Sequence, residues 1–415
     1  MSDQRTLNAD IIAKEALAIL DNELSWLGRI HRAHESEFSQ TVNGYKIGEE
    51  ISIRRPADFI IRSGPTMNLQ DVIEGKVTFR VDQQKGVDFS FSSTDLTLKI
   101  EDLSERVIKP AMINLINDVA ADVLRNAYLP TYNWVGTPGQ TISSFAAFNK
   151  VVTRMNEMAI PIDSRLAILS PEDHGEFVSA QTGLFVSDVA RAALRNGELG
   201  VINSCDTYMS QVVPTHSTGT RDNSTPLVNG ASQVVTYAAA KDTWSQDLIT
   251  DGWDNNATIK AGDVFAIADV YMVNPKTKES TGILQQFVVL EDKTADGSGN
   301  ATLKISPPII TSGPHQTVNA APGNDKTITV VGDASKSYRQ NLFMHKNAMA
   351  LAVVPMAMPE GAVNGSRRTR KGLSVRVIPV YDGVNDVSKW RLDILYGRKL
   401  IDPRLSVRAS GTASS

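Results

Sequence analysis

The first regular hydrophobic pattern along the chain lies close to the N-terminus. Leucines recur there at intervals of three and four residues with acidic residues between them, which predicts one amphipathic helix. A helix with such an apolar stripe has to bury it, either against its own domain or against another copy of the chain. The stripe consists of Leu17, Leu20, Leu24 and Leu27.

The next segment, residues 43–68, carries more charge, glycine and proline and has a thinner apolar face. We expect it to project from the protein as an extended loop, with the adjacent cations Arg54 and Arg55 near its base. Apolar residues then alternate with polar ones on both sides of residues 83–86, which predicts a β-hairpin. The alternating residues are Val77, Phe79 and Val81, then Val87, Phe89 and Phe91.

The longest helical pattern covers residues 101–129 and has a broad apolar face. Pro130 ends it, and Pro110 within the pattern means that the helix either begins near Lys109 or bends there. The chain then alternates between helical and strand patterns, which is typical of an α/β arrangement. We expect helices at 145–158, from Pro171 and at 186–195, short buried strands at 166–169 and 207–213, a helix at 340–352, and strands at 374–380 and 390–396.

An abrupt change of composition sets residues 215–333 apart from both flanks. This stretch is rich in Thr, Ser, Gly, Asn and Asp, and turn signals separate its short apolar strands. We therefore predict an all-β barrel or immunoglobulin-like domain inserted into the α/β part. Its expected strands are 264–273, 284–289, 302–305 and 327–331.

Composition and charge narrow the class of protein. The chain has 415 residues, 41% hydrophobic and 21% charged, so we expect two or three folded units rather than disorder. The net charge of −4 argues against tight binding of nucleic acid, because such proteins usually carry a basic excess. No apolar run reaches the roughly 20 residues that cross a bilayer, and the N-terminus does not resemble a secretory signal. The single cysteine, Cys205, favours a reducing compartment.

Catalytic and metal-binding patterns of recognisable spacing are missing from the sequence. The pair His31 and His34 lacks a third ligand, and His174 is most simply a residue of a first helical turn. Asp382 and Asp386 suit a hairpin turn better than a metal site that would also use Asp393, and Cys205 has no activating neighbour. We therefore predict no catalytic residues, no cofactor and no metal.

One basic cluster stands out near the C-terminus. It consists of Arg367, Arg368, Arg370 and Lys371. A solvated loop is the simplest interpretation, and a salt bridge to another copy of the chain or a phosphate contact is the alternative.

The C-terminal third resembles the major capsid proteins of tailed bacteriophages. The resemblance rests on residues 341–352, Val354-Pro355, the run 358–361, residues 372–376 and 391–397, and Asp402-Pro403. It is strongest to the short-tailed-phage coat branch that carries an inserted β domain, and the order of elements agrees along nearly the whole chain. It implies the α+β Hong Kong-type capsid fold. The implied parts are an N-terminal arm helix (1–42), an extended loop (43–68), a peripheral domain with a spine helix (69–134), an axial domain (135–214), the inserted β domain (215–335), an axial return (336–372), and peripheral strands with the C-terminus (373–415).

The function implied by this resemblance is that of a major capsid protein, not an enzyme. Hexamers and pentamers would form an icosahedral shell in the bacterial cytoplasm and enclose double-stranded DNA without sequence-specific binding, with a scaffolding protein and a portal protein as partners. A nanocompartment shell, a surface protein with an immunoglobulin-like module and an α/β enzyme are the alternatives. Contacts between subunits are expected at Leu17, Leu20, Leu24, Leu27, Arg54, Arg55, Arg367, Arg368 and Arg370.

Overall fold

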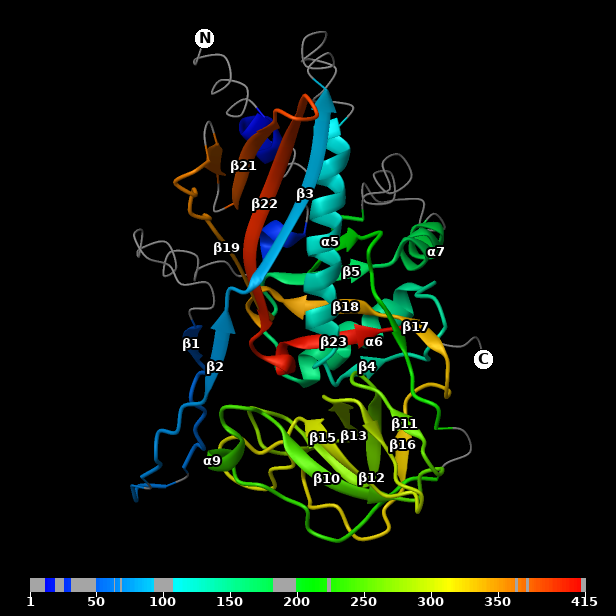
Figure 1. The fold of residues 1–415 in the computed structure, drawn as a ribbon. Coiled ribbons are helices and arrows are strands. Elements are labelled where there is room, and N and C mark those ends of the chain that lie inside the picture. Colours follow the sequence, from blue (N-terminus) through cyan, green and yellow to red (C-terminus); the bar gives the residue numbers. More distant parts are fainter. Residues whose placement is uncertain are drawn as a thin grey trace. The chain divides into compact units, whose positions relative to one another are not determined.

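The computed structural model describes residues 12–18, 26–30, 50–62, 64–67, 69–92, 107–181, 199–221, 225–362, 365–370 and 373–411. The chain divides into two compact units, each assembled from separate stretches of sequence (Figure 1). The first unit comprises Met1–Ile51, Thr78–Val123 and Met349–Lys399, and the second comprises Ser52–Val77, Leu124–Ala348 and Leu400–Ser415.

A five-stranded sheet forms the frame of the first unit. Its strands follow the order β19-β22-β21-β20, and β3 is a further partner of β22 outside this order. The strands are β3 (Gln83–Ser92), β19 (Met349–Val354), β20 (Ser366–Arg370), β21 (Leu373–Asp382) and β22 (Val387–Leu400). The predicted strands at 374–380 and 390–396 are thus confirmed, and the turn between them lies at 383–386.

Strand β3 corrects the predicted hairpin. It pairs antiparallel with β22 over its full length, from Gln83 opposite Tyr396 to Ser92 opposite Val387. The strand before it, β2 (Lys76–Arg80), pairs instead with β1 (Glu50–Arg54). The alternation of apolar residues marked both strands correctly, but alternation shows only which side chains share a face and not which strand lies alongside.

Helix α5 (Lys109–Tyr128) is the long predicted helix, and it begins at Lys109, one of the two starts that Pro110 allowed. Its apolar face is buried, including Met112, Leu115 and Val119. Polar contacts join the same helix to the sheet of the first unit. Lys85 of β3 lies 2.8 Å from Asp118, and the Tyr396 hydroxyl of β22 donates a 2.7 Å hydrogen bond to Asp122.

A mixed six-stranded sheet, called the central sheet below, organises the second unit. Its order is β4-β23-β18-β5-β7-β6. The strands are β4 (Trp134–Val135), β5 (Arg165–Leu169), β6 (Val201–Ile202), β7 (Cys205–Met209), β18 (Asn341–His345) and β23 (Ser406–Ala409), the last preceded by the short helix η4 (Pro403–Leu405). The predicted helices appear as α6 (Phe145–Glu157) and α7 (Pro171–Gln181). The predicted helix at 186–195 lies outside the described residues.

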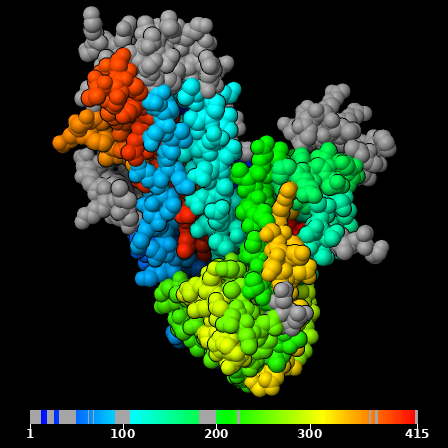
Figure 2. Space-filling model, turned by 45° about the vertical axis from the view of Figure 1, so that its right-hand side comes forward, coloured from blue at the N-terminus to red at the C-terminus, as the bar shows by residue number. Residues whose placement is uncertain are grey.

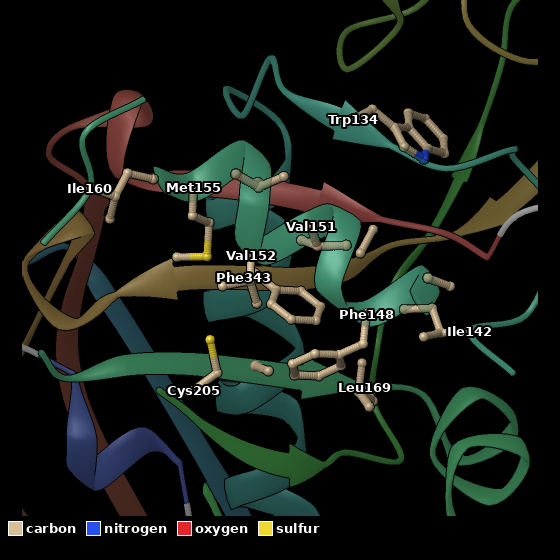
Figure 3. Packing of buried hydrophobic residues seen from close by; sticks show 14 of the residues in the cluster. Trp134, Ile142, Phe148, Val151, Val152, Met155, Ile160, Leu169, Cys205 and Phe343 are labelled. Atoms are coloured by element: carbon tan, nitrogen blue, oxygen red, sulfur yellow. The ribbon is translucent and has the colours of Figure 1, made fainter. Parts of the chain in front are cut away.

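The apolar contacts of the central sheet form one cluster, called the central core below. Phe148 of α6 stacks on Phe177 of α7 with ring centroids 5.2 Å apart and meets Phe343 of β18 edge-on at 5.0 Å. Figure 3 shows Phe148, Val151 and Met155 of the helix facing Phe343 and Leu169 of the sheet. Burial of these large side chains stabilises the arrangement by roughly 1.5–3 kcal/mol each.

The predicted helix at 340–352 is wrong. Residues there form β18, the short helix η3 (Lys346–Ala348) and β19. Every residue of both strands is buried, so neither strand has exposed positions from which a period of two or of 3.6 could be recognised. Pairing of β18 with β5 on one side and β23 on the other decided its conformation.

The inserted β domain has a sheet of its own, in the order β16-β12-β13-β15-β10-β9 (Figure 1). The atoms of this domain are coloured green to yellow in Figure 2. The strands are β9 (Leu227–Val228), β10 (Gln246–Asp251), β12 (Val264–Val273), β13 (Ser280–Val289), β15 (Ala301–Ser306) and β16 (Ile328–Val330), accompanied by β11 (Thr258–Ile259), β14 (Lys293–Thr294) and the short helix α9 (Tyr237–Ala240). All four predicted strands are confirmed. They enclose a separate apolar cluster, the inserted core, which includes Leu248, Phe265 and Phe287.

The two ends of the insertion pair with each other. Strand β8 (Thr215–Ser217) runs antiparallel to β17 (Ser337–Arg339), with His216 opposite Tyr338. The chain therefore enters and leaves the inserted domain through one two-stranded neck, as an insertion into an existing domain requires.

Candidate assembly surfaces

The extended loop, which the structure describes between β1 and β2, exposes large apolar side chains. Ile61 and Leu69 are 90% and 85% exposed. The other exposed apolar residues of the loop are Phe59, Ile60, Met67 and Val72. Sequence reasoning singled out the cations at the base of this loop and missed these residues. The signal was present, because a Phe-Ile-Ile run in a polar, proline-containing loop has no periodicity that would bury it.

The two cations at the base of the loop have different environments. Arg54 is exposed and lies 3.0 Å from Glu74 on the opposite side of the loop. Arg55 is buried within its own chain, where its guanidinium donates to the carbonyl oxygens of Lys241 at 3.2 Å and Ile401 at 3.3 Å. Arg55 thus has two hydrogen-bond acceptors inside the second unit, and its intersubunit contact stays a prediction.

The N-terminal stripe is partly accounted for by the chain itself. Residues 12–18 are helical, and Leu17 and Leu27 are buried. Both side chains are thus buried within the chain itself, and a contact of this stripe with a neighbouring copy stays a prediction. Leu20 and Leu24 lie outside the described residues.

The arginines of the basic cluster lie on strand β20 and not in a loop. This strand is at the edge of its sheet, with β21 as its neighbour, and Arg367 and Arg368 are exposed. Arg367 donates a 2.8 Å hydrogen bond to the carbonyl oxygen of Met356. The backbone of Arg370 belongs to β20, while its side chain and Lys371 are outside the described set. Charged residues on an edge strand also hinder uncontrolled pairing with other strands.

Ion pairs within the neighbouring strands β21 and β22 support the edge strand β20. Arg376 lies opposite Arg367 in the neighbouring strand and donates a 2.6 Å hydrogen bond to the buried carboxylate of Asp393. Arg391 also reaches Asp393, at 2.8 Å. A buried carboxylate with two guanidinium partners holds β21 and β22 in register, so the exposed cations of β20 are presented by a rigid support.

The inserted domain is joined to the central sheet by buried polar contacts. Gln286 of β13 accepts a 2.7 Å hydrogen bond from the Trp134 backbone and returns one of 3.0 Å to its carbonyl oxygen. Arg408 of β23 is fully buried and donates to the carbonyl oxygens of Gly262 and Leu129 at 2.8 and 3.3 Å. Burial lowers the pKa of Arg408 to about 9, which still leaves the side chain charged at neutral pH.

A second buried group lies beside the neck of the insertion. His216 of β8 lies 2.9 Å from Asp263, and Arg221 lies 3.7 Å from the same carboxylate. All three side chains are buried. Because a buried carboxylate needs partners, this group ties the point where the chain enters the insertion to the turn before β12.

The residues considered for chemistry do not come together. Asp382 lies in the β21–β22 hairpin, where Asn385 and Lys389 donate to it, whereas Asp393 is buried against Arg376. Burial raises the pKa of the Cys205 thiol to about 11, which opposes nucleophilic reactivity. Within the described residues no group of three or more His, Cys, Asp or Glu side chains could hold a metal ion. His31 and His34 are not among the residues described.

Comparison with known proteins covers nearly the whole chain. A family model described as "P22 coat protein - gene protein 5" matches residues 32–411. The major capsid protein of Acyrthosiphon pisum secondary endosymbiont phage 1 is 22% identical over 379 residues, which cover 86% of this chain and 88% of that protein.

Solved structures of phage proteins are also similar. A chain from Mycobacterium phage Che8 has a TM-score of 0.45 and 11% identity, covering 92% of this chain and 89% of that one. The CUS-3 coat protein I-domain is 26% identical with a TM-score of 0.19, and it covers 26% of this chain and 96% of the domain.

The family match agrees with the sequence resemblance and with the observed order of elements. It confirms the predicted Hong Kong-type capsid fold with an inserted β domain, and it confirms that the protein is structural and not an enzyme. The chain belongs to the family of P22-like coat proteins, the major capsid proteins that form the icosahedral shell of tailed phages.

Proposed function

We propose that copies of this chain associate as hexamers and pentamers, and that the exposed apolar residues of the extended loop are a principal contact with the neighbouring copy. The observation that carries the proposal is the exposure of six large apolar side chains within residues 59–72. Exposed apolar residues this close together in the sequence are typical of a surface that another protein covers. Burial of each side chain would contribute roughly 1.5–3 kcal/mol to association before the entropy of ordering is subtracted.

Charged residues on the same surfaces belong to the proposal as secondary contacts. Arg54 beside the apolar run and Arg367 and Arg368 on the edge strand are exposed, and they would form ion pairs with a neighbouring copy. Such pairs are worth less than about 1 kcal/mol each and are screened by salt. Leu17, Leu20, Leu24, Leu27, Arg55 and Arg370 stay in the proposal on the strength of the sequence pattern. Leu17, Leu27 and Arg55 are buried within the chain, so the exposed residues carry the proposal more directly.

The proposed content of the shell is double-stranded DNA, held without sequence-specific contacts. The net charge of −4 supports a wall that repels phosphate rather than binding it. A scaffolding protein and a portal protein are the further partners that the family resemblance favours. None of the described helices has both the length and the apolar composition that a membrane span requires.

Assembly of purified protein tests the proposal. The wild-type chain, with its scaffolding protein if one is needed, should sediment as capsomers and closed particles and show shells by electron microscopy. Ile61→Asp should lower the assembled fraction at least tenfold, because it places a charge in the proposed contact. Its unfolding free energy should stay within about 0.5 kcal/mol of wild type, since the side chain is exposed.

Ile249→Asp is the matched control. Ile249 is half exposed on β10 of the inserted domain, away from the loop in sequence. It should assemble as wild type does. Normal shells from Ile61→Asp, or equal defects in both variants, would contradict the proposed contact, and a wild-type chain that stays monomeric at high concentration would contradict assembly itself.

A further inference from the structure

The base of the extended loop is attached to the inserted domain. The Arg55 guanidinium donates to the carbonyl oxygen of Lys241, which follows helix α9. On the other side of the loop, the backbone amide of Lys76 donates a 2.9 Å hydrogen bond to the Asp242 carboxylate. Both sides of the loop therefore contact the same segment, residues 237–244, which we call the clamp segment (Figure 1).

A glycine makes this attachment possible. Gly75 packs so closely on the clamp segment that a Cβ atom built on it would overlap the carbonyl oxygen of Lys241. Its own carbonyl oxygen accepts a 2.8 Å hydrogen bond from the Arg55 backbone amide, which joins the two sides of the loop. Any larger residue at position 75 would push the loop away from the inserted domain.

Arg55 depends on the attachment for its burial. Its guanidinium lies 5.5 Å from the ring centroid of Trp244, with the carbonyl oxygens of Lys241 and Ile401 as its hydrogen-bond acceptors. Burial lowers the pKa of Arg55, which shows that the charged form is desolvated there. A buried guanidinium is tolerated only while its partners are in place, so detachment of the clamp segment would leave this charge unsatisfied.

A salt bridge fixes the loop at a second point. Lys278, in the turn after β12, lies 3.0 Å from Asp58, and both side chains are largely buried. Burial alone would raise the pKa of Asp58, but the hydrogen bond and charge of Lys278, the Phe59 amide and the charge of Lys276 together outweigh it and lower the pKa. The carboxylate is therefore charged, and a partly buried pair of this kind is screened less than an exposed one.

In its outer part the described residues of the loop hydrogen-bond to one another. The Gln70 side chain accepts a 2.8 Å hydrogen bond from the Ile60 amide and donates one of 2.6 Å to the Ile60 carbonyl oxygen. The exposed apolar residues lie in this outer part. The outer part of the loop is thus bonded within itself, and its base is attached to the inserted domain. A small change in the direction of the base would therefore displace the outer part by a larger distance.

We propose that the inserted domain positions the extended loop, so that the clamp segment and Lys278 set the direction in which the loop's apolar residues meet a neighbouring copy. This role rests on the proposed function of the loop and adds to it. The inserted domain then acts on assembly through its contacts with the base of the loop, and Arg55, Gly75 and Asp58 are positioning residues.

Two substitutions in the full-length chain test this role. Gly75→Ala introduces the overlapping Cβ, and the matched control is Gly297→Ala, at a turn where a Cβ would meet nothing within 4 Å. Lys278→Gln removes the salt bridge without a steric conflict. Its control is Lys260→Gln, which removes the exposed pair with Asp292, 2.9 Å apart within the inserted domain.

Amide hydrogen exchange of the unassembled subunit is the first measurement. Gly75→Ala should raise exchange of the amides of residues 55–76 at least tenfold, and Lys278→Gln at least threefold. Strands β12 and β13 should exchange as in wild type, which separates a loosened loop from an unfolded domain. Both control variants should match wild type throughout. If Gly75→Ala does not fold, Lys278→Gln decides the question alone.

Assembly rate is the second measurement, followed by light scattering. Both loop variants should assemble at least threefold more slowly than their controls. Unchanged exchange in the loop would overturn the attachment, and faster exchange with wild-type assembly would overturn its role in assembly. Failure of the wild-type chain to assemble would instead contradict the proposed function, and the exchange result would still decide whether the base of the loop is attached.

Discussion

The central sheet and the inserted sheet have six strands each, but they differ in how far apart those strands lie in the sequence and in how completely the strands are buried. The central sheet collects strands from sequence positions as far apart as β4 at 134–135 and β23 at 406–409, and β5 and β18 are buried at every residue. The inserted sheet draws all its strands from residues 227–330, and β10 and β15 alternate between buried and exposed positions.

This difference has a physical consequence for folding. The entropy of closing a chain segment grows with its length, so contacts between distant strands form late and only together with others. The inserted sheet can form from one continuous stretch, whereas the central sheet needs the last residues of the chain before it is complete. We infer that the insertion is a local folding unit and that the central sheet is the cooperative one.

The two regions are nevertheless coupled through packing. Val264, Met272 and Val288 belong to strands of the inserted sheet but pack in the central core. One surface of the insertion therefore completes the domain into which it is inserted. The comparison is thus between a region that can fold alone and a region that relies on its insertion.

Removal of the insertion should have the largest effect. The isolated fragment of residues 215–333 should fold cooperatively and bind neither nucleic acid nor a small ligand, because it contains the whole inserted core. The remaining chain, closed by a Gly/Ser linker, should lose several kcal/mol of stability, since three buried side chains at roughly 1.5–3 kcal/mol each would be missing. Amide NMR of the fragment and denaturant unfolding of the remainder check this. A collapsed, undispersed fragment spectrum would show that the insertion is no folding unit.

Matched core truncations should give the next largest effect. Phe343→Ala in the central core and Phe287→Ala in the inserted core both remove a fully buried ring and should cost about 3–5 kcal/mol. Hydrogen exchange should separate them. Phe343→Ala should lower protection in both sheets, whereas Phe287→Ala should lower it mainly in the inserted sheet. Equal loss of protection in β5 and β18 from Phe287→Ala would remove the distinction between the two regions.

Acidification should have a smaller effect that reports on the boundary of the inserted domain. Burial lowers the pKa of His315 to about 4 from its usual 6.5, and its ring stacks on Tyr237 of the clamp segment with centroids 3.6 Å apart. The unfolded chain binds this proton more readily than the folded one. The contribution to stability is therefore complete above pH 6.5 and declines as the pH falls from 6.5 toward 4.

His315→Phe provides the test of this pH dependence, because it keeps a stacking ring and removes the titrating group. Between pH 7 and pH 5 the wild-type unfolding free energy should fall by at most about 2 kcal/mol more than that of the variant. Denaturant titrations at the two pH values measure this difference. An identical decline in both proteins would assign the acid sensitivity to other groups, such as His345 of β18, whose pKa burial also lowers.

The accuracy of the predictions made from sequence differs between the same two regions. Strand β12 was predicted at its observed bounds, Val264–Val273, because turn signals separate the short apolar strands of the insertion. The run 340–352 was predicted as a helix and forms two strands, because strands that are buried at every residue show no period. The family resemblance, carried by the order of elements and short motifs, identified the capsid protein correctly where these local patterns failed.

Prediction from sequence had a similar limit at the candidate assembly surfaces. Sequence alone located the extended loop and its cations, but it could not tell that Arg55 turns inward while Arg54 stays exposed, because neighbouring residues of a loop look equivalent until their partners are known. Only the tertiary structure placed Lys241 and Ile401 beside Arg55.

What the sequence by itself determined is the set of features that depend on neighbours in the chain: the presence of the spine helix, the inserted strands, the hairpin at 381–386 and the family motifs. What only the tertiary structure decided is the choice of partners. Strand β3 pairs with β22 instead of β2, β18 is a strand between β5 and β23, and Gly75 packs on Lys241. Periodicity reports which faces of an element are apolar, whereas pairing depends on distant segments that compete for the same buried backbone groups.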